Sequence, residues 1–220
     1  MPSAVSAPPA AAATTYSLTV TNKSAQSQHF CLYQSAVDLG VPGARSLAWL
    51  TAHAKPNRTV TFTWAVDYSF VWGLTGQLTS GIQFVTGEVV AADPSDLSEN
   101  TITFEFYDKW YKFGPVSGGI KPLGTLAIYV SPTVPPETTS VGTGMSGFPV
   151  FAVQASPTEG NALVFRPHPE YWITAGTFIS GEVLNVEKLT SKAEIPYTDT
   201  FSMNATLEPS GLWTVSAASA

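Results

Sequence analysis

The sequence is poor in cysteine, in charge and in long apolar runs, and each shortage excludes a class of structure. Among the 220 residues there is a single cysteine, Cys31. A disulfide within one chain is therefore excluded, and stability has to come from buried side chains. No apolar stretch of the sequence reaches the roughly 18 residues that a membrane-spanning helix requires. We therefore predict a chain without a membrane span.

Charged residues make up only 12% of the chain, and the formal net charge is -6 at pH 7. Nucleic acids and anionic membranes attract dense clusters of Lys and Arg, and the sequence contains no such cluster. We therefore expect no nucleic-acid partner. Low charge gives little electrostatic resistance to association, so the composition favours self-association or binding to another protein.

The first residues also lack the features of an export signal. Residues 1–15 are rich in Ala and Pro and have neither the basic start nor the leucine-rich centre of a signal peptide. We predict a flexible tail and a cytoplasmic protein, and non-classical export stays open.

What the sequence does have is alternation. Residues 59–73 read TVTFTWAVDYSFVWG, in which aromatic or β-branched residues occupy every second position on both sides of Asp67. This period of two predicts two strands in succession, as a hairpin or a bent ribbon, each with one buried face. The aromatic side chains on these faces are predicted to be core residues rather than ligand contacts: Phe62, Trp64, Phe70 and Trp72.

Further alternating segments fill most of the chain and give the fold class. We predict an all-β protein: a single-domain β-sandwich over residues 16–220, made of two mainly antiparallel sheets with little or no helix. The only hint of helix is at 41–55, and residues 131–147, SPTVPPETTSVGTGMSG, are predicted to be a long loop. The other predicted strands are 16–22, 30–34, 82–90, 101–107, 123–130, 150–154, 162–166, 180–188 and 201–207.

Several of these segments together resemble the RhiA family of bacterial proteins. They are CLYQ at 31–34, VPGARSLAWL at 41–50, TFTWAVDYSFVW at 61–72, GMSG at 144–147 and RPHPEYWIT at 166–174. The likeness extends from about residue 16 to the C-terminus. The family is named for expression in the rhizosphere under quorum-sensing control and has no established catalytic role. The resemblance therefore implies a part in population-dependent or plant-associated behaviour, and it assigns no functional residue.

One polar triplet is a candidate ligand-binding site. Arg166, His168 and Glu170 are spaced by two, and the prolines between them hold the segment extended. Side chains at this spacing project to one side, where they could bind a ligand or transfer protons. The alternative is a solvated edge strand in which proline blocks further pairing.

A second candidate is the aromatic group in the segment YDKWYKFG. Trp110 and Tyr111 lie between Lys109 and Lys112 in a predicted turn or short hairpin. Exposed aromatic side chains on a sheet stack on sugar rings and anchor protein interfaces. The alternative is that the group caps the core.

Catalytic and metal motifs are weak by comparison. No two of the three histidines have metal-ligand spacing, so we predict no metal site, and nothing in the sequence indicates a cofactor. Ser146 lies in a Gly-rich loop without the strand-to-helix turn of a serine elbow. A carboxylate pair for hydrolysis would have to come from acids on or near predicted strands: Glu88, Glu105, Asp108, Glu182 and Glu187.

These observations leave three hypotheses for the function. A non-catalytic binding or self-assembling protein is favoured over an enzyme, because no catalytic constellation is visible. A carbohydrate-binding module or lectin, using the Trp110 group, is the first alternative. A hydrolase centred on His168 or on a carboxylate pair is the second.

Overall fold

The computed structural model describes residues 14–119, 122–157 and 160–218. These residues form seventeen strands and one short 3-10 helix, η1 (Val186–Lys188). The predicted all-β class and mainly antiparallel pairing are confirmed. Most of the predicted tail lies outside the described residues, but its last residue, Thr15, already belongs to a strand.

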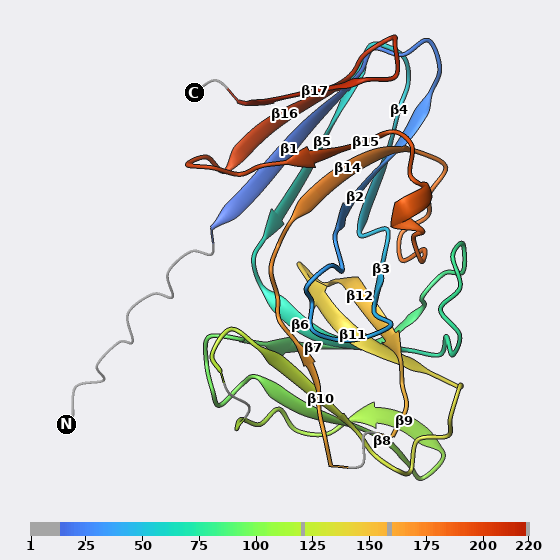
Figure 1. The fold of residues 1–220 in the computed structure, drawn as a ribbon, viewed down its shortest axis with the longest axis vertical. Coiled ribbons are helices and arrows are strands. Elements are labelled where there is room, and N and C mark those ends of the chain that lie inside the picture. The colour runs from blue at the N-terminus through green and yellow to red at the C-terminus, as the bar shows by residue number, and fades with distance from the viewer. Residues whose placement is uncertain (1–13, 120–121, 158–159, 219–220) are drawn as a thin grey trace, which may run out of the picture.

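The strands hydrogen-bond into four sheets, where the sequence predicts two. Two sheets form the upper half of the molecule in Figure 1. In order, the first contains β17 (Trp213–Ala217), β16 (Ser202–Leu207), β1 (Thr15–Asn22) and β5 (Arg58–Ala65). The second contains β15 (Lys192–Ile195), β14 (Tyr171–Gly176), β2 (Gln28–Gln34) and β4 (Leu50–Ala54).

The other two sheets form the lower half (Figure 1). The third contains β3 (Arg45–Ser46), β12 (Phe148–Gln154), β11 (Ser140–Met145), β6 (Tyr68–Gly73) and β7 (Thr86–Ala92). The fourth contains β13 (Leu163–Phe165), β10 (Leu126–Val130), β8 (Thr101–Tyr107) and β9 (Trp110–Phe113). Two strand pairs are parallel, β1 with β16 and β8 with β10, and the remaining pairs are antiparallel.

The alternating ribbon bends from the upper half into the lower half. β5 pairs with β1, and β6 pairs with β11 and β7, so the two strands belong to different sheets and do not form a hairpin. The bend lies at Val66 and Asp67, between the two strands. The predicted core positions of the ribbon are confirmed, since their side chains are at most 9% exposed: Phe62, Trp64, Phe70 and Trp72.

The prediction of one long loop at 131–147 is wrong, because the segment contains β11. This strand is buried along its whole length and lies between β6 and β12. Glycine normally weakens a strand signal, but here it lets neighbouring backbones approach. A Cβ atom on Gly142 would overlap the carbonyl oxygen of Phe151 on β12. The composition of the segment therefore reflects close packing of strands.

Two smaller predictions also fail. The segment 41–55 contains β3 and β4 and no helix, and its apolar residues Leu47 and Trp49 are fully buried. The segment 180–188 forms isolated pairings, such as Leu47 with Val183, followed by η1. In the first segment the continuous burial of residues 46–49 removes the alternation that distinguishes a strand from a helix.

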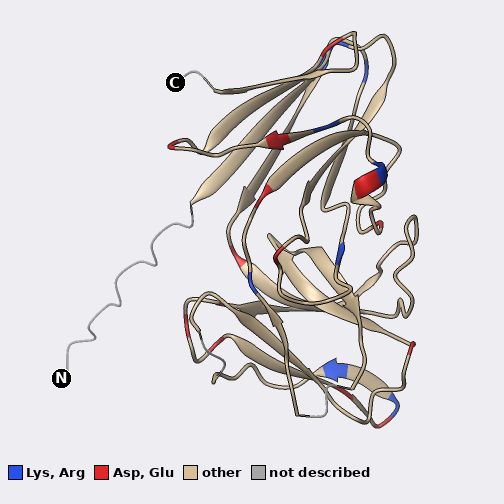
Figure 2. Ribbon diagram, viewed as in Figure 1, with Lys and Arg blue, Asp and Glu red and all other residues tan. Residues whose placement is uncertain are grey.

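One buried hydrophobic cluster contains side chains from all four sheets, for example Leu18, Leu32, Phe70 and Phe104. Charged residues are sparse over both halves (Figure 2), in keeping with their 12% share of the chain. Most of the solvated strand surface is therefore left to Ser, Thr and single apolar side chains.

Candidate ligand-binding site

A cleft lies where the start of β1, the β5–β6 bend and the neighbouring strands β14 and β15 meet. Its volume is about 290 Å³, at the small end of the range for ligand sites. We call it the tyrosine cleft, after the three tyrosines among its lining residues: Tyr16, Val66, Pro169, Glu170, Tyr171, Glu194, Ile195, Pro196 and Tyr197.

The tyrosine rings form a connected aromatic wall. The ring centroids of Tyr16 and Tyr197 are 5.0 Å apart and those of Tyr171 and Tyr197 are 5.5 Å apart, both in edge-to-face contact. Trp64 packs behind this wall, with its centroid 5.0 Å from that of Tyr171. The alternation of β5 directs the Trp64 side chain inward, so the sequence pattern of the ribbon determines which residue packs behind the tyrosine rings.

Two of the tyrosine hydroxyls are already oriented by the protein. Tyr197 donates to the carbonyl oxygen of Ser17 at 2.8 Å, and Tyr171 donates to the sulfur of Met145 at 3.8 Å. Burial raises the pKa of Tyr171 and Tyr197, so both hydroxyls are neutral at physiological pH. The hydroxyl of Tyr16 makes no hydrogen bond to any described residue. It is therefore available to a ligand.

Two glutamates are also among the lining residues, and they differ in orientation. Glu194 lies on β15 opposite Trp172 of β14, so its side chain shares the face of Trp172 and points to the other side of the sheet from Tyr171. Glu170 directly precedes β14; the Nε2 atom of His168 lies 3.4 Å from Glu170 Oε1, and these side chains are 67% and 43% exposed. Carboxylate oxygens are strong hydrogen-bond acceptors, so Glu170 is the acidic residue of the cleft that can offer acceptors near the tyrosine rings.

The predicted triplet is only partly brought together. Residues 166–170 form the extended connection from β13 to β14 rather than an edge strand. Glu170 lines the cleft and His168 contacts Glu170, whereas the stem of Arg166 lies beside Gly40. The Arg166 N–H donates to the carbonyl oxygen of Leu39 at 2.8 Å, which holds the connection against the loop after β2.

Comparison with known proteins gives the family. A sequence model described as RhiA matches residues 13–218. Protein RhiA of Rhizobium leguminosarum bv. viciae is 35% identical over 210 residues, which cover 93% of this chain and 87% of that protein. The chain belongs to the RhiA family. No solved structure matches it.

In this RhiA-family chain the aromatic group of the β8–β9 hairpin divides into an exposed and a packed part. Trp110 is 73% exposed, and its cross-strand neighbour Tyr107 is 66% exposed. Tyr111 instead stacks on Phe104, with a centroid distance of 5.9 Å, and donates to Thr138 Oγ1 at 2.9 Å. Of the two predicted residues, Trp110 is thus exposed to solvent and Tyr111 is half-buried.

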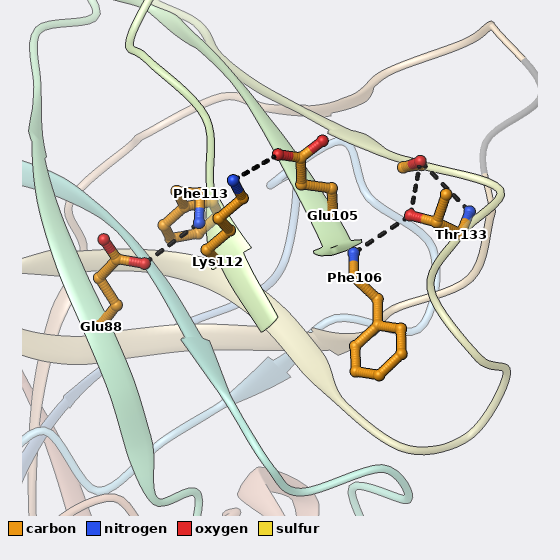
Figure 3. A network of polar contacts seen from close by, with 7 residues as sticks. Glu88, Glu105, Phe106, Lys112, Phe113 and Thr133 are labelled. Atoms are coloured by element: carbon orange, nitrogen blue, oxygen red, sulfur yellow. Dashed lines mark hydrogen bonds and ion pairs between the residues drawn. The ribbon is translucent and has the colours of Figure 1, made fainter. Parts of the chain in front are cut away.

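Polar contacts fix this hairpin to its neighbours (Figure 3). Glu88 Oε2 accepts hydrogen bonds from the Phe113 N–H at 3.1 Å and from Trp72 Nε1 at 2.9 Å. Lys112 Nζ lies 3.3 Å from Glu105 Oε1, and the Phe106 N–H donates to Thr133 Oγ1 at 3.1 Å. Glu88 and Glu105 thus have separate structural partners.

Ser146 fastens the ribbon bend to the β11–β12 hairpin. Its Oγ accepts from the Ala65 N–H at 2.9 Å and donates to the Ala65 carbonyl oxygen at 3.1 Å. Its own N–H donates to Asp67 Oδ1 at 2.8 Å. No histidine contacts Ser146 in the described part of the chain, and its hydroxyl is engaged with backbone. The serine has a structural role next to the cleft residue Val66.

The remaining nucleophilic and metal-ligating side chains are buried or dispersed in the described part of the chain. Cys31 is fully buried, and burial raises the pKa of its thiol, so the thiol is protonated and inert. Within residues 14–119, 122–157 and 160–218, no three His, Cys, Asp or Glu side chains are grouped to hold a metal ion. The same residues contain no helix long and apolar enough to cross a membrane.

Four of the cleft residues, Tyr16, Tyr171, Glu194 and Tyr197, were not predictable as a site. Tyr16 and Tyr171 follow the strand alternation and read as core positions. Glu194 lies on a strand of four residues that carries too little periodicity to be recognised. Their convergence depends on the pairing of β14 with β15 and on the position of β1, which no local sequence signal contains.

Proposed function

We propose that this chain is a non-catalytic binding protein and that the tyrosine cleft binds a saccharide. The observation that carries the proposal is the convergence of three tyrosine rings with Glu170 in one cleft of about 290 Å³. A ligand of this class suits host or community interaction under quorum control, the setting that the family resemblance implies.

The chemistry of a sugar ring matches this lining. A pyranose has apolar C–H faces, which pack on aromatic rings, and an equatorial belt of hydroxyls, which donate to carboxylates. Glu170 supplies acceptors, and the hydroxyl of Tyr16 supplies a further polar contact. His168, beside Glu170, is placed to orient that carboxylate. The volume suits about one sugar ring rather than a long chain.

We test the proposal by glycan-array screening followed by affinity measurement on the best saccharide. Glu170→Gln should weaken binding about tenfold or more, because a hydrogen bond to a charged group contributes about 1.5–3 kcal/mol. Glu187→Gln, an exposed glutamate on η1 outside the cleft, is the matched control and should bind like the wild type. An array without hits would overturn the proposal.

Two further outcomes separate the alternatives. Loss of binding in Trp110→Ala, with Glu170→Gln unaffected, would place the site on the β8–β9 hairpin instead of the cleft. Cleavage of the bound saccharide, followed by mass spectrometry, would contradict a non-catalytic role and favour a hydrolase that uses Glu170 and His168.

Self-association is a second candidate function, and the edge strand β17 favours it. Its five residues carry no charge, and adjacent Leu212 is 70% exposed. The Ala218 N–H donates to the carbonyl oxygen of Ser202, and the Glu208 N–H donates to that of Leu212. In an antiparallel pair the residues whose peptide groups face the partner strand alternate with residues whose peptide groups face away. The N–H and C=O groups of Val215 therefore face away from β16. Such an edge is a template for a second strand.

We expect the wild-type protein to show concentration-dependent dimers in size-exclusion chromatography with light scattering. Val215→Pro removes an outward N–H and should give a monomer, because proline cannot donate to an added strand. Val215→Thr keeps that N–H and should dimerise like the wild type. A wild-type monomer at every concentration would exclude assembly through this edge.

A further inference from the structure

Two histidines far apart in the sequence lie directly opposite each other on neighbouring strands. The β2–β4 register pairs His29 with His53, and their ring centroids are 4.9 Å apart with an angle of 64° between the rings. Both residues are exposed to solvent. They lie in the upper half of the molecule, on the second sheet.

Both imidazole rings are exposed to solvent and have free nitrogen atoms within the described part of the chain. Neither imidazole hydrogen-bonds to another residue in the described part of the chain, and each has the other as its ring neighbour. On the far side of His29, β14 contributes Gly176, which has no side chain. The ring of Phe178 lies over that glycine, since a Cβ on Gly176 would come within 2.7 Å of it.

We propose that His29 and His53 together bind a divalent transition-metal ion, with water in the remaining coordination positions. Metal–nitrogen bonds of about 2.0–2.1 Å, with two imidazoles at about 90–110° around the ion, place the ring centroids about 4.5–5.2 Å apart. The observed separation of 4.9 Å lies within this range. The β2–β4 register therefore holds the two rings at a centroid separation that a shared ion requires.

The ligand set indicates which ions bind. Neutral imidazole suits Cu²⁺, Ni²⁺ and Zn²⁺, and the general affinity order for divalent ions makes Cu²⁺ the tightest of these. Because the described residues add no third His, Cys, Asp or Glu to the pair, the site has two protein ligands and open positions. Hard ions such as Mg²⁺ and Ca²⁺ prefer oxygen ligands and should not bind here.

The site was not predictable from spacing. Metal motifs are recognised when ligands lie a few residues apart, whereas these two histidines become neighbours only through the register of β2 with β4. The inference is also independent of the tyrosine cleft, whose lining contains neither histidine.

The experiment is a titration of the full chain with Cu²⁺, followed by electron paramagnetic resonance. We expect one ion bound with nitrogen hyperfine coupling. His29→Ala and His53→Ala should each weaken this binding at least tenfold. His168→Ala removes the third histidine, which contacts Glu170, and should leave binding unchanged. Circular dichroism verifies that each variant is folded.

A second measurement uses Zn²⁺, which has no redox chemistry. An ion that joins β2 to the edge strand β4 should raise the Tm of the wild type and of His168→Ala, and should not raise it in either site variant. Absence of Cu²⁺ binding in the wild type would overturn the proposal. Equal loss of binding in His168→Ala, or binding unchanged in both site variants, would overturn it as well.

Discussion

Gly142→Ala is expected to destabilise the protein by about 3 kcal/mol, because the added methyl group has no space in the third sheet. The Cβ atom would overlap the carbonyl oxygen of Phe151, which is backbone and cannot rotate away. Either β11 or β12 has to shift, and β11 pairs on both sides. The change should appear as a lower urea midpoint with the same slope.

Gly114→Ala is the matched control for this substitution. A Cβ atom there would lie 3.7 Å from the carbonyl oxygen of Thr103, an ordinary van der Waals contact. We expect the free energy of unfolding to change by about 0.5 kcal/mol or less. Equal stability of the two variants would contradict the close approach of β11 and β12.

Trp64→Ala is expected to lower the free energy of unfolding by about 3–5 kcal/mol. Trp64 is 2% exposed and contacts the rings of Trp49, Tyr16 and Tyr171, so its removal leaves a cavity behind the aromatic wall. For a chain of this size, about 1 kcal/mol corresponds to about 2–4 °C in Tm. Differential scanning calorimetry would measure the shift.

Trp110→Ala makes the same chemical change at a side chain that is 73% exposed. It should alter the free energy of unfolding by about 0.5 kcal/mol or less, because little burial is lost. The two variants thus separate a core tryptophan from a surface one. If Trp110→Ala proved as destabilising as Trp64→Ala, the exposed position of the hairpin residue would be wrong.

The sequence allows the fold class and much of the core to be predicted, and the ribbon shows why. Alternation reports which face of a strand is buried, so Phe62, Trp64, Phe70 and Trp72 were predictable one by one. The partner of each strand is a long-range property. For that reason the alternation could not decide between a hairpin and the observed bend at Asp67, which sends β5 and β6 into different sheets.

The candidate site was predictable only in part for the same reason. The spacing of Glu170 and His168 on a proline-rich segment predicted that they belong to one site, and their side chains are in contact. The spacing could not indicate that Arg166 lies beside Gly40 instead. The remaining cleft residues come from β1, the β5–β6 bend, β14, and β15 with the residues that follow it, and the proximity of these segments is decided by packing of the whole upper half.

The parallel pairing of β1 with β16 has a consequence for biosynthesis. Ser17 on the first strand lies opposite Ser202, and their side chains bond across a sequence separation of 185 residues. At about 5–20 residues per second, synthesis of the intervening chain takes on the order of ten seconds or more. During that time one edge of β1 is without its native partner. Completion of the first sheet therefore has to wait until β16 and β17 have been synthesised, and loss of these two strands would leave β1 as an open edge.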